Sequence, residues 1–255
     1  MTRKLLLLGS TISALVLASL ETTAVGAGTD ILHFSDRAAF TNNGVVSSAS
    51  GTVSARENKQ GNADNETVDV ALKKLDTNAP YSLLVTTDDT NRVDVADFTT
   101  DKHGKATVNF RKLGNGHGVG HGNIELPAAM DPVVGLRTFT VVNADTNAVL
   151  TADLTTPAQF QFLVKRDMST NDIKATLSIQ ANNKKARLSL TARGLPGTND
   201  YLLVLNGNIA QTNSANAHGH LEMAATLDNP ADALDLKSVI VSDTASNIVL
   251  STTLP

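Results

Sequence analysis

Apolar and polar residues alternate in short runs along most of the chain. In residues 187–192, Leu188, Leu190 and Ala192 fall on one side, and the residues between them are polar. A period of two is typical of a half-buried strand. The run from Tyr201 to Leu205 is apolar on both sides, as in a central strand. No segment after about residue 27 has a sustained helical period, so the pattern predicts an all-β chain.

The same pattern occurs twice. Leu75 precedes Tyr81 by six residues, and Leu195 precedes Tyr201 by six, so the two tyrosines of the chain share one repeat position. His103-Gly104 matches His218-Gly219 in the same register, with a strand pattern following each. We infer two copies of one unit. Pro157 lies just past the first copy, so the boundary falls near residues 155–158. Residues 28–156 then form the first repeat and residues 157–255 the second.

One insertion distinguishes the copies. From the His-Gly pair to the Asn before the last strand is 44 residues in the first copy and 29 in the second. The 15 extra residues fall near 111–125 and are rich in glycine and histidine. Insertions of this kind lie on the surface, in loops.

Each copy predicts about seven strands. In the first copy they fall near 52–57, 66–75, 81–86, 93–97, 105–111, 136–142 and 148–154. In the second they fall near 174–180, 186–193, 201–206, 208–212, 220–226, 236–242 and 247–253. An extra strand precedes the second copy, and its start is marked by the alternating residues Phe160, Phe162 and Val164. Residues 143–147 and 243–247 predict Asx-type turns. Gly104 and Gly219 predict positive φ.

The segment around Tyr201 resembles a known family. The run Gly194-Leu195-Pro196-Gly197-Thr198-Asn199-Asp200-Tyr201 is similar to the turn-and-tyrosine segment of fibronectin type III and other immunoglobulin-like modules. The resemblance implies a hydrogen bond from the tyrosine hydroxyl to backbone a few residues upstream. One departure from the family is the position of this tyrosine. In fibronectin modules the tyrosine comes late, whereas here four predicted strands follow it. The whole pattern also resembles tandem repeats of secreted bacterial proteins of unknown function.

We therefore expect two tandem immunoglobulin-like antiparallel β-sandwich domains, with a barrel as the alternative. The N-terminus favours export. Residues 1–27 have a basic start at Arg3 and Lys4, an apolar stretch from Leu5 to Leu20, and small residues at the end. This is typical of a cleaved signal peptide. The predicted localisation is secreted or periplasmic, with no membrane attachment after cleavage.

Composition excludes several classes of function. The chain has no cysteine and no tryptophan among its 255 residues, and a formal charge of −4. Disulfide frameworks, thiolate metal sites and cysteine nucleophiles are therefore excluded. Loss of Arg3, Lys4 and Glu21 with the signal changes the charge to −5, and for an acidic chain we expect no nucleic-acid partner.

The inserted loop carries the candidate metal ligands. His117 and His121 lie four residues apart among glycines, and neutral imidazoles could bind Cu²⁺, Ni²⁺ or Zn²⁺. Two ligands are few for a tight site, and the alternative is a solvent-facing loop whose histidines are incidental. His103 is too far along the strand to join them. His218 and His220 flank Gly219, where a turn is the simpler interpretation.

Other chemistry is weakly indicated. The acidic segment Asp88-Asp89-Thr90-Asn91, with Asp94 and Asp97, does not have EF-hand spacing, so we expect solvated turns. The chain has no G-x-S-x-G, H-E-x-x-H, P-loop or dinucleotide motif. We predict no catalytic residues, no bound cofactor, and a non-enzymatic structural or adhesive role at the cell surface or in the extracellular matrix. Its partners would be other surface or matrix proteins, or itself. The alternatives are a periplasmic or secreted metal-binding protein and an enzyme with a dispersed site.

Overall fold

The protein is an all-β molecule. The computed structural model describes residues 30–87, 92–112, 122–154, 160–170 and 172–254. These ranges contain β-strands and short 3-10 helices, and no α-helix. No helix within the described ranges is long and apolar enough to cross a bilayer. The predicted signal peptide, residues 1–27, lies outside them.

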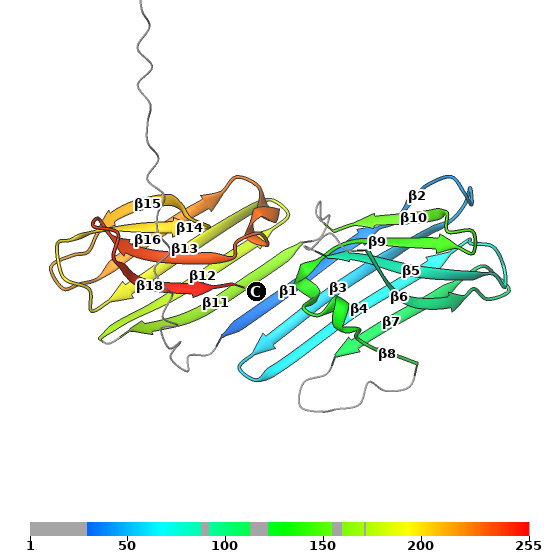
Figure 1. The fold of residues 1–255 in the computed structure, drawn as a ribbon, viewed down its shortest axis with the longest axis horizontal. Helices are drawn as coiled ribbons and strands as arrows, with labels where there is room; N and C mark the ends of the chain where they lie inside the picture. The colour runs from blue at the N-terminus through cyan, green and yellow to red at the C-terminus, as the bar shows by residue number, and fades with distance from the viewer. Residues whose placement is uncertain (1–29, 88–91, 113–121, 155–159, 171, 255) are drawn as a thin grey trace, which may run out of the picture.

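One long sheet runs through both halves of the chain (Figure 1). Its nine strands follow the order β16 (Leu221–Leu227), β13 (Lys185–Arg193), β12 (Ile173–Asn182), β11 (Gln161–Thr170), β1 (Ile31–Ala39), β3 (Ser50–Gln60), β4 (Ala63–Lys73), β7 (Ala106–Lys112) and β8 (Ile124–Glu125). All neighbours are antiparallel except β7 and β8. The strands of the second half thus continue the sheet of the first.

Two smaller sheets lie against the long one, one in each half (Figure 1). The five-stranded sheet has the order β2 (Thr41–Asn42), β10 (Ala148–Asp153), β9 (Leu136–Asn143), β5 (Pro80–Thr87) and β6 (Arg92–Thr99). The four-stranded sheet has the order β15 (Asn208–Ser214), β14 (Asp200–Leu205), β17 (Ser238–Asp243) and β18 (Ile248–Thr253). Alternate side chains of facing strands are buried, for example Val70 and Leu83 in the first half and Leu190 and Leu203 in the second.

The predicted strands are confirmed, with small shifts at their ends. The strand expected to begin near Phe160 is β11, and the two turn segments at 143–147 and 243–247 are present. Asn147 N donates to Asn143 Oδ1 at 2.9 Å, and Asn247 N donates to Asp243 Oδ1 at 2.8 Å. The strand β1 was not predicted, because Asp36 interrupts its inward apolar series.

Both tyrosines occupy the same place in their halves, as predicted. Tyr201 is buried, and its hydroxyl donates to the carbonyl of Pro196 at 3.2 Å. The Tyr81 hydroxyl accepts from Asp76 N and donates to Asp76 Oδ2, both at 3.2 Å. Each bond reaches five residues upstream, which fixes the turn before the central strand.

The sheet register shows which residues of the two halves correspond. Val68 is opposite Ala55, which is opposite Asp36; Leu188 is opposite Ile179, which is opposite Val164. Val68 and Leu188 are 120 residues apart, the same offset as Tyr81 and Tyr201, so Asp36 corresponds to Val164.

Phe34 lies two residues before Asp36, and Phe162 lies two residues before Val164, so Phe34 corresponds to Phe162. These two residues are themselves direct partners where β1 pairs with β11. The two halves therefore meet through equivalent strands, around a local pseudo-twofold axis.

Candidate functional site

Three carboxylates gather at the inner side of the β3–β4 hairpin. Glu57 lies on β3, and Asp64 and Glu66 lie on β4; we call them the carboxylate cluster. One oxygen from each lies within 4.8 Å of the others. Glu57 and Glu66 are direct cross-strand partners, with 2% and 0% of their surface exposed. The strand alternation places both on the face that otherwise carries core residues.

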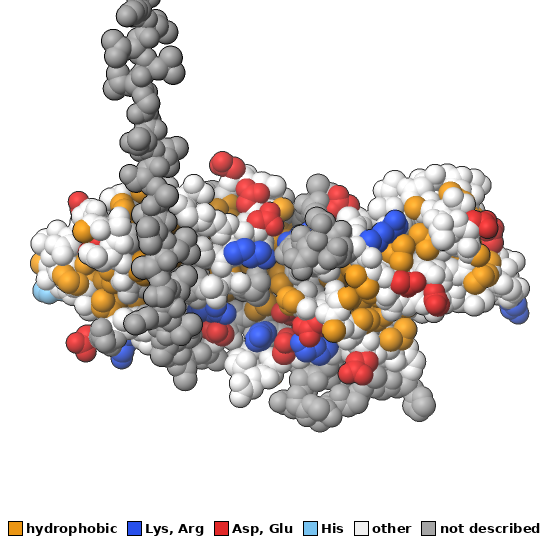
Figure 2. Space-filling model, in the orientation of Figure 1, with side chains coloured by type: hydrophobic (Ala, Val, Ile, Leu, Met, Phe, Trp, Pro, Cys, Tyr) orange, Lys and Arg blue, Asp and Glu red, His pale blue; other side chains and the backbone are white. Residues whose placement is uncertain are grey.

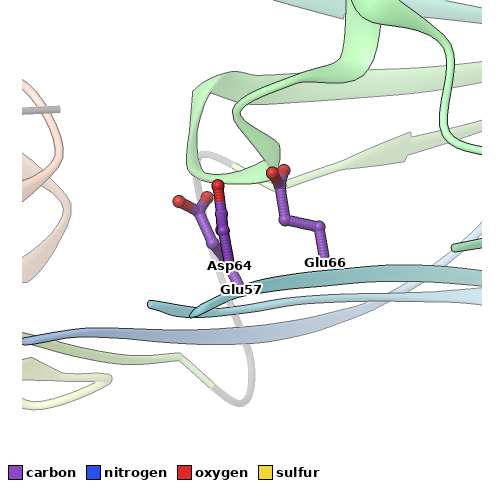
Figure 3. Close-up of side chains that lie close together, drawn as sticks. All are labelled: Glu57, Asp64 and Glu66. Carbon is purple, nitrogen blue, oxygen red and sulfur yellow. The ribbon is translucent and has the colours of Figure 1, made fainter. Parts of the chain in front are cut away.

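The two glutamates bind the backbone of η3 (Val133–Gly135). Val133 N donates to Glu66 Oε2 at 2.8 Å, and Val134 N donates to Glu57 Oε2 at 3.0 Å. In Figure 3 the carboxylates point toward the green segment above the strands, which carries this short helix. The first amides of a helix have no acceptor within it, so the glutamates supply acceptors that η3 lacks.

A lysine provides the positive charge of the cluster. Lys112 Nζ, at the end of β7, lies 2.6 Å from Glu66 Oε1, 3.0 Å from Asp64 Oδ2 and 2.8 Å from Asp131 Oδ2. An ammonium group has three protons to donate. All three are matched by carboxylate oxygens, so Lys112 is saturated.

Burial determines the protonation of the glutamates. Desolvation raises the pKa of Glu66 to about 7, against the opposing hydrogen bond from Lys112. It also raises the pKa of Glu57, although the amide of Val134 opposes the shift. Burial alone would lower the pKa of Lys112, but its hydrogen bonds to Asp131, Glu66 and Asp64 outweigh burial and raise it. The cluster therefore combines a fixed ammonium with a glutamate that can take up a proton near neutral pH.

The arrangement is suited to fastening a loop. Carboxylate oxygens are the donors that Ca²⁺ and Mg²⁺ prefer, but here Lys112 already binds Asp64 and Glu66. The remaining glutamate oxygens hold two backbone amides of η3. The cluster thus compensates charge and anchors the segment that leads into β9.

A cavity of about 240 Å³ adjoins the cluster at the boundary between the two halves. Glu57 and Asp64 line it from the first half, and Val164 and Arg166 line it from β11. Arg166 Nε lies 3.2 Å from Asp30 Oδ2, and the same guanidinium donates to the carbonyl of Thr253. Acidic and basic side chains lie next to one another in the middle of the face seen in Figure 2. Arg166 of β11 therefore joins the residue before β1 by an ion pair and β18 by a hydrogen bond to a backbone carbonyl.

The predicted metal ligands lie in the inserted loop. His117 and His121 lie outside the described residues, so the metal site in the inserted loop stays a prediction. The described parts of the insertion are residues 111–112 at the end of β7 and residues 122–125, which include β8.

His103, His218 and His220 lie in turns, whereas His33 lies on β1, where its Nδ1 is 2.8 Å from Asn58 Oδ1. His218 N and His220 N both donate to Asn216 Oδ1, at 2.9 and 3.0 Å. His103 N donates in the same way to Asp101 Oδ1 at 2.8 Å. Gly104 and Gly219 follow with φ of 67° and 70°, which confirms the positive φ predicted for them.

The acidic segment does not come together as a site in its described part. Residues 88–91 lie outside the described ranges. Asp94 and Asp97 are exposed on β6, and Asp97 accepts a hydrogen bond from Ser82 Oγ at 2.6 Å. This agrees with solvated polar residues on an edge strand.

Sequence reasoning missed the carboxylate cluster, although a signal existed. Glu57 and Glu66 fall in phase with the apolar positions of their strands. The second half has Ala181 and Ala186 paired at the corresponding place, and Leu227 where the first half has Lys112. A charged triplet replacing an apolar one within a repeat marks the position.

No protein-family model matches the chain, and no curated protein is found to match it either.

Proposed function

We propose that this protein is an exported, non-enzymatic structural or adhesive protein of the cell surface or extracellular matrix, built from two immunoglobulin-like β-sandwich repeats. The observation that carries the proposal is the pairing of β1 with β11. It makes one sheet of nine strands from two repeats. A continuous sheet suits a rigid element that spaces or presents surfaces.

The immunoglobulin-like assignment is supported by shared details of the two halves. Each has a small sheet against its part of the long sheet, and each has a tyrosine whose hydroxyl bonds to a residue five positions upstream. Bonds of this kind fix a corner in immunoglobulin-like modules. In this proposal the first repeat ends near residue 156 and the second begins at residue 157.

Side chains at the junction support rigidity. Phe34 and Phe160 pack edge to face with ring centroids 6.3 Å apart, and Phe160 stacks on Phe162 at 6.4 Å. Arg137 of the first half lies 3.5 Å from Asp235 of the second, in addition to the Arg166–Asp30 pair. Aromatic packing and ion pairs add to the backbone hydrogen bonds of β1 and β11.

A cross-linking experiment tests the continuous sheet. The chain has no cysteine, so a His33→Cys, Leu163→Cys double variant introduces one pair at directly opposed positions. Opposed residues in antiparallel strands have the Cα separation that a disulfide needs. We expect rapid cross-linking under mild oxidation and an unchanged small-angle X-ray scattering profile.

The matched control moves one cysteine by two residues. Ser35 is opposite Gln161, so Ser35→Cys with Leu163→Cys should cross-link much more slowly. Equal rates for the two double variants would remove the rigid two-repeat element from the proposal.

Localisation tests the proposed role itself. Fractionation of cells expressing the full chain should place a processed protein in the surface or matrix fraction, with a new N-terminus near residue 28. A protein that stays unprocessed in the cytoplasm, or that is released entirely into the medium, would contradict it.

A further inference from the structure

The outward side of the nine-stranded sheet is basic. Side chains on alternate positions of each strand point away from the smaller sheets; we call these positions the outer sheet face. In the first half its cations are Arg37, Arg56, Lys73 and Arg111. In the second half they are Lys165, Lys174, Lys185, Arg187 and Arg193.

Few carboxylates oppose these cations. On the described strands of the sheet, the acidic residues of this face are Asp69, Glu125, Asp167 and Glu222. Nine cations against four carboxylates leave an excess of five positive charges, on a chain whose formal charge is −4. Charge is therefore segregated by face.

Two of the carboxylates are already bound within the face. Asp69 forms an ion pair with Arg111, and Asp167 accepts a hydrogen bond from Thr176 Oγ1 at 2.7 Å. They therefore have less capacity to bind the remaining cations.

Two arginines at the centre of the first half have no such partner. Arg37 and Arg56 are exposed, and neither guanidinium forms a hydrogen bond or ion pair with another described residue. Both line a depression of about 260 Å³, together with Thr52, Ser54 and Asp69, whose carboxylate is paired with Arg111. Arg37 is opposite Ser54, two residues from Arg56 on the same side of β3. Both guanidinium groups can therefore reach one anionic group.

We propose that the outer sheet face binds an acidic polysaccharide, with Arg37 and Arg56 holding one of its carboxylate or sulfate groups. Guanidinium groups match these anions with paired hydrogen bonds. Hydroxyl side chains such as Ser35, Thr67 and Ser178 lie between the cations, where they can bond sugar hydroxyls. The inference rests on the proposed adhesive role and gives it a ligand class.

The composition of the face favours a polysaccharide over other polyanions. No Phe or Tyr occupies an outward position on the described strands of the sheet, and single-stranded nucleic acids are bound by stacking their bases on aromatic rings. Among the described residues of this face there is also no cluster of large apolar side chains, which an amphipathic surface inserts into a membrane. Recognition must then come from charge and hydrogen bonds.

The test measures binding of the mature full chain to alginate and to dextran sulfate at about 50 mM salt, with neutral dextran as the blank. We expect binding to at least one of the acidic polymers and none to dextran. The double variant Arg37→Gln, Arg56→Gln should weaken binding about tenfold. The salt dependence of its binding should correspond to about two fewer ions released on binding, one for each guanidinium removed.

A second double variant controls for net charge. Lys102→Gln, Lys105→Gln removes the same charge from the exposed turn before β7, away from the outer sheet face, and should change affinity by less than about twofold. Equal losses in the two double variants, or no binding to either acidic polymer, would overturn the proposal.

Two other ligands complete the experiment. Binding of single-stranded DNA or of phosphatidylglycerol vesicles as tight as binding of the polysaccharides would also overturn the ligand class. The cross-linking test of the β1–β11 junction does not depend on any of these results, so failure here leaves the two-repeat element standing.

Discussion

Glu57 and Glu66 stand directly opposite each other on β3 and β4, and both side chains point into the interior. Like charges at such positions destabilise a sheet. The first half tolerates them because Lys112 and the amides of η3 bind their oxygens. The second half, with Ala181 and Ala186 in their place, shows that the fold itself does not require them.

Removal of the lysine should expose the cost of this arrangement. Lys112→Leu introduces the residue type found at the corresponding position, Leu227. It leaves Glu66 buried without its cation, which should lower the free energy of unfolding by about 3–5 kcal/mol. Urea unfolding at pH 8 measures the loss.

A double variant separates charge from packing. Glu66→Gln with Lys112→Leu keeps an acceptor for Val133 N but removes the buried charge. We expect it to be more stable than Lys112→Leu alone by about 1–3 kcal/mol. If the double variant is as unstable as the single one, packing of the lysine and not charge explains the loss.

The raised pKa of Glu66 predicts a pH dependence of stability. Burial raises the pKa of Glu66 to about 7 from 4.5, so between these pH values the folded state binds more protons than the unfolded state. Stability should therefore fall as pH rises from about 4.5 to about 7, by an amount on the order of a few kcal/mol. Urea unfolding across this range should show the slope, and Glu66→Gln should reduce it; an unchanged slope in the variant would assign it elsewhere.

Local patterns explain why the strands could be predicted and the cluster could not. Alternation and turn residues are properties of neighbouring positions, so β13 and the Asx turns follow from sequence. The hydrogen bond of the Tyr201 hydroxyl is expected from the resemblance to immunoglobulin-like modules. The contacts of Glu66 and Glu57 reach residues 67 and 77 positions away. No periodic signal indicates which loop will cover an inward carboxylate.

The pairing of β1 with β11 was also missed, because it too joins residues far apart in sequence. Asp36 breaks the apolar series of β1, which hid the strand. Its pairing with β11 joins segments separated by the whole first half. The repeat spacing predicts two units, but it does not indicate that their corresponding strands are paired.

Asp36 is a second buried carboxylate with a predicted effect on stability. It is 1% exposed, Oδ2 has no hydrogen-bond partner in the described structure, and burial raises the pKa of Asp36 to about 6. The amide of Arg37 lowers the pKa and Asp153 raises it further. Because the folded state binds the extra proton, stability should fall as pH rises from about 4 to about 6.

Neutral substitutes for Asp36 should therefore stabilise the protein at pH 8. Asp36→Asn retains an acceptor for Arg37 N, and Asp36→Val introduces the residue of the corresponding position, Val164. We expect at least one to raise the free energy of unfolding by about 1–3 kcal/mol, with a flatter profile below pH 6. A loss in both at pH 8 would show that the charged carboxylate is needed.

The tyrosine hydroxyls should contribute in both halves. Tyr201→Phe removes the bond to the carbonyl of Pro196, and should cost about 1 kcal/mol. Tyr81→Phe removes the bonds to Asp76 N and Asp76 Oδ2, and should cost somewhat more, about 1–2 kcal/mol. Thermal unfolding of the two variants tests both values, and a neutral Tyr201→Phe would mean that the corner bond adds nothing.

Gly104 and Gly219 provide the sharpest steric test, because the two halves repeat it. A Cβ at either position would lie 2.1 Å from a backbone carbonyl oxygen, of Leu75 or of Leu195 respectively. Each glycine also has positive φ and accepts from the amide of the same leucine, at 3.0 and 3.2 Å. The neighbour is backbone and cannot move aside without breaking that bond. Gly104→Ala and Gly219→Ala should therefore each cost more than about 2 kcal/mol.

Gly207→Ala is the matched control, since Gly207 has φ of 82° with nothing within 4 Å of its Cβ position. Left-handed backbone alone should cost about 1 kcal/mol there. Urea midpoints for the three variants would contradict the steric argument if all three fell by the same amount.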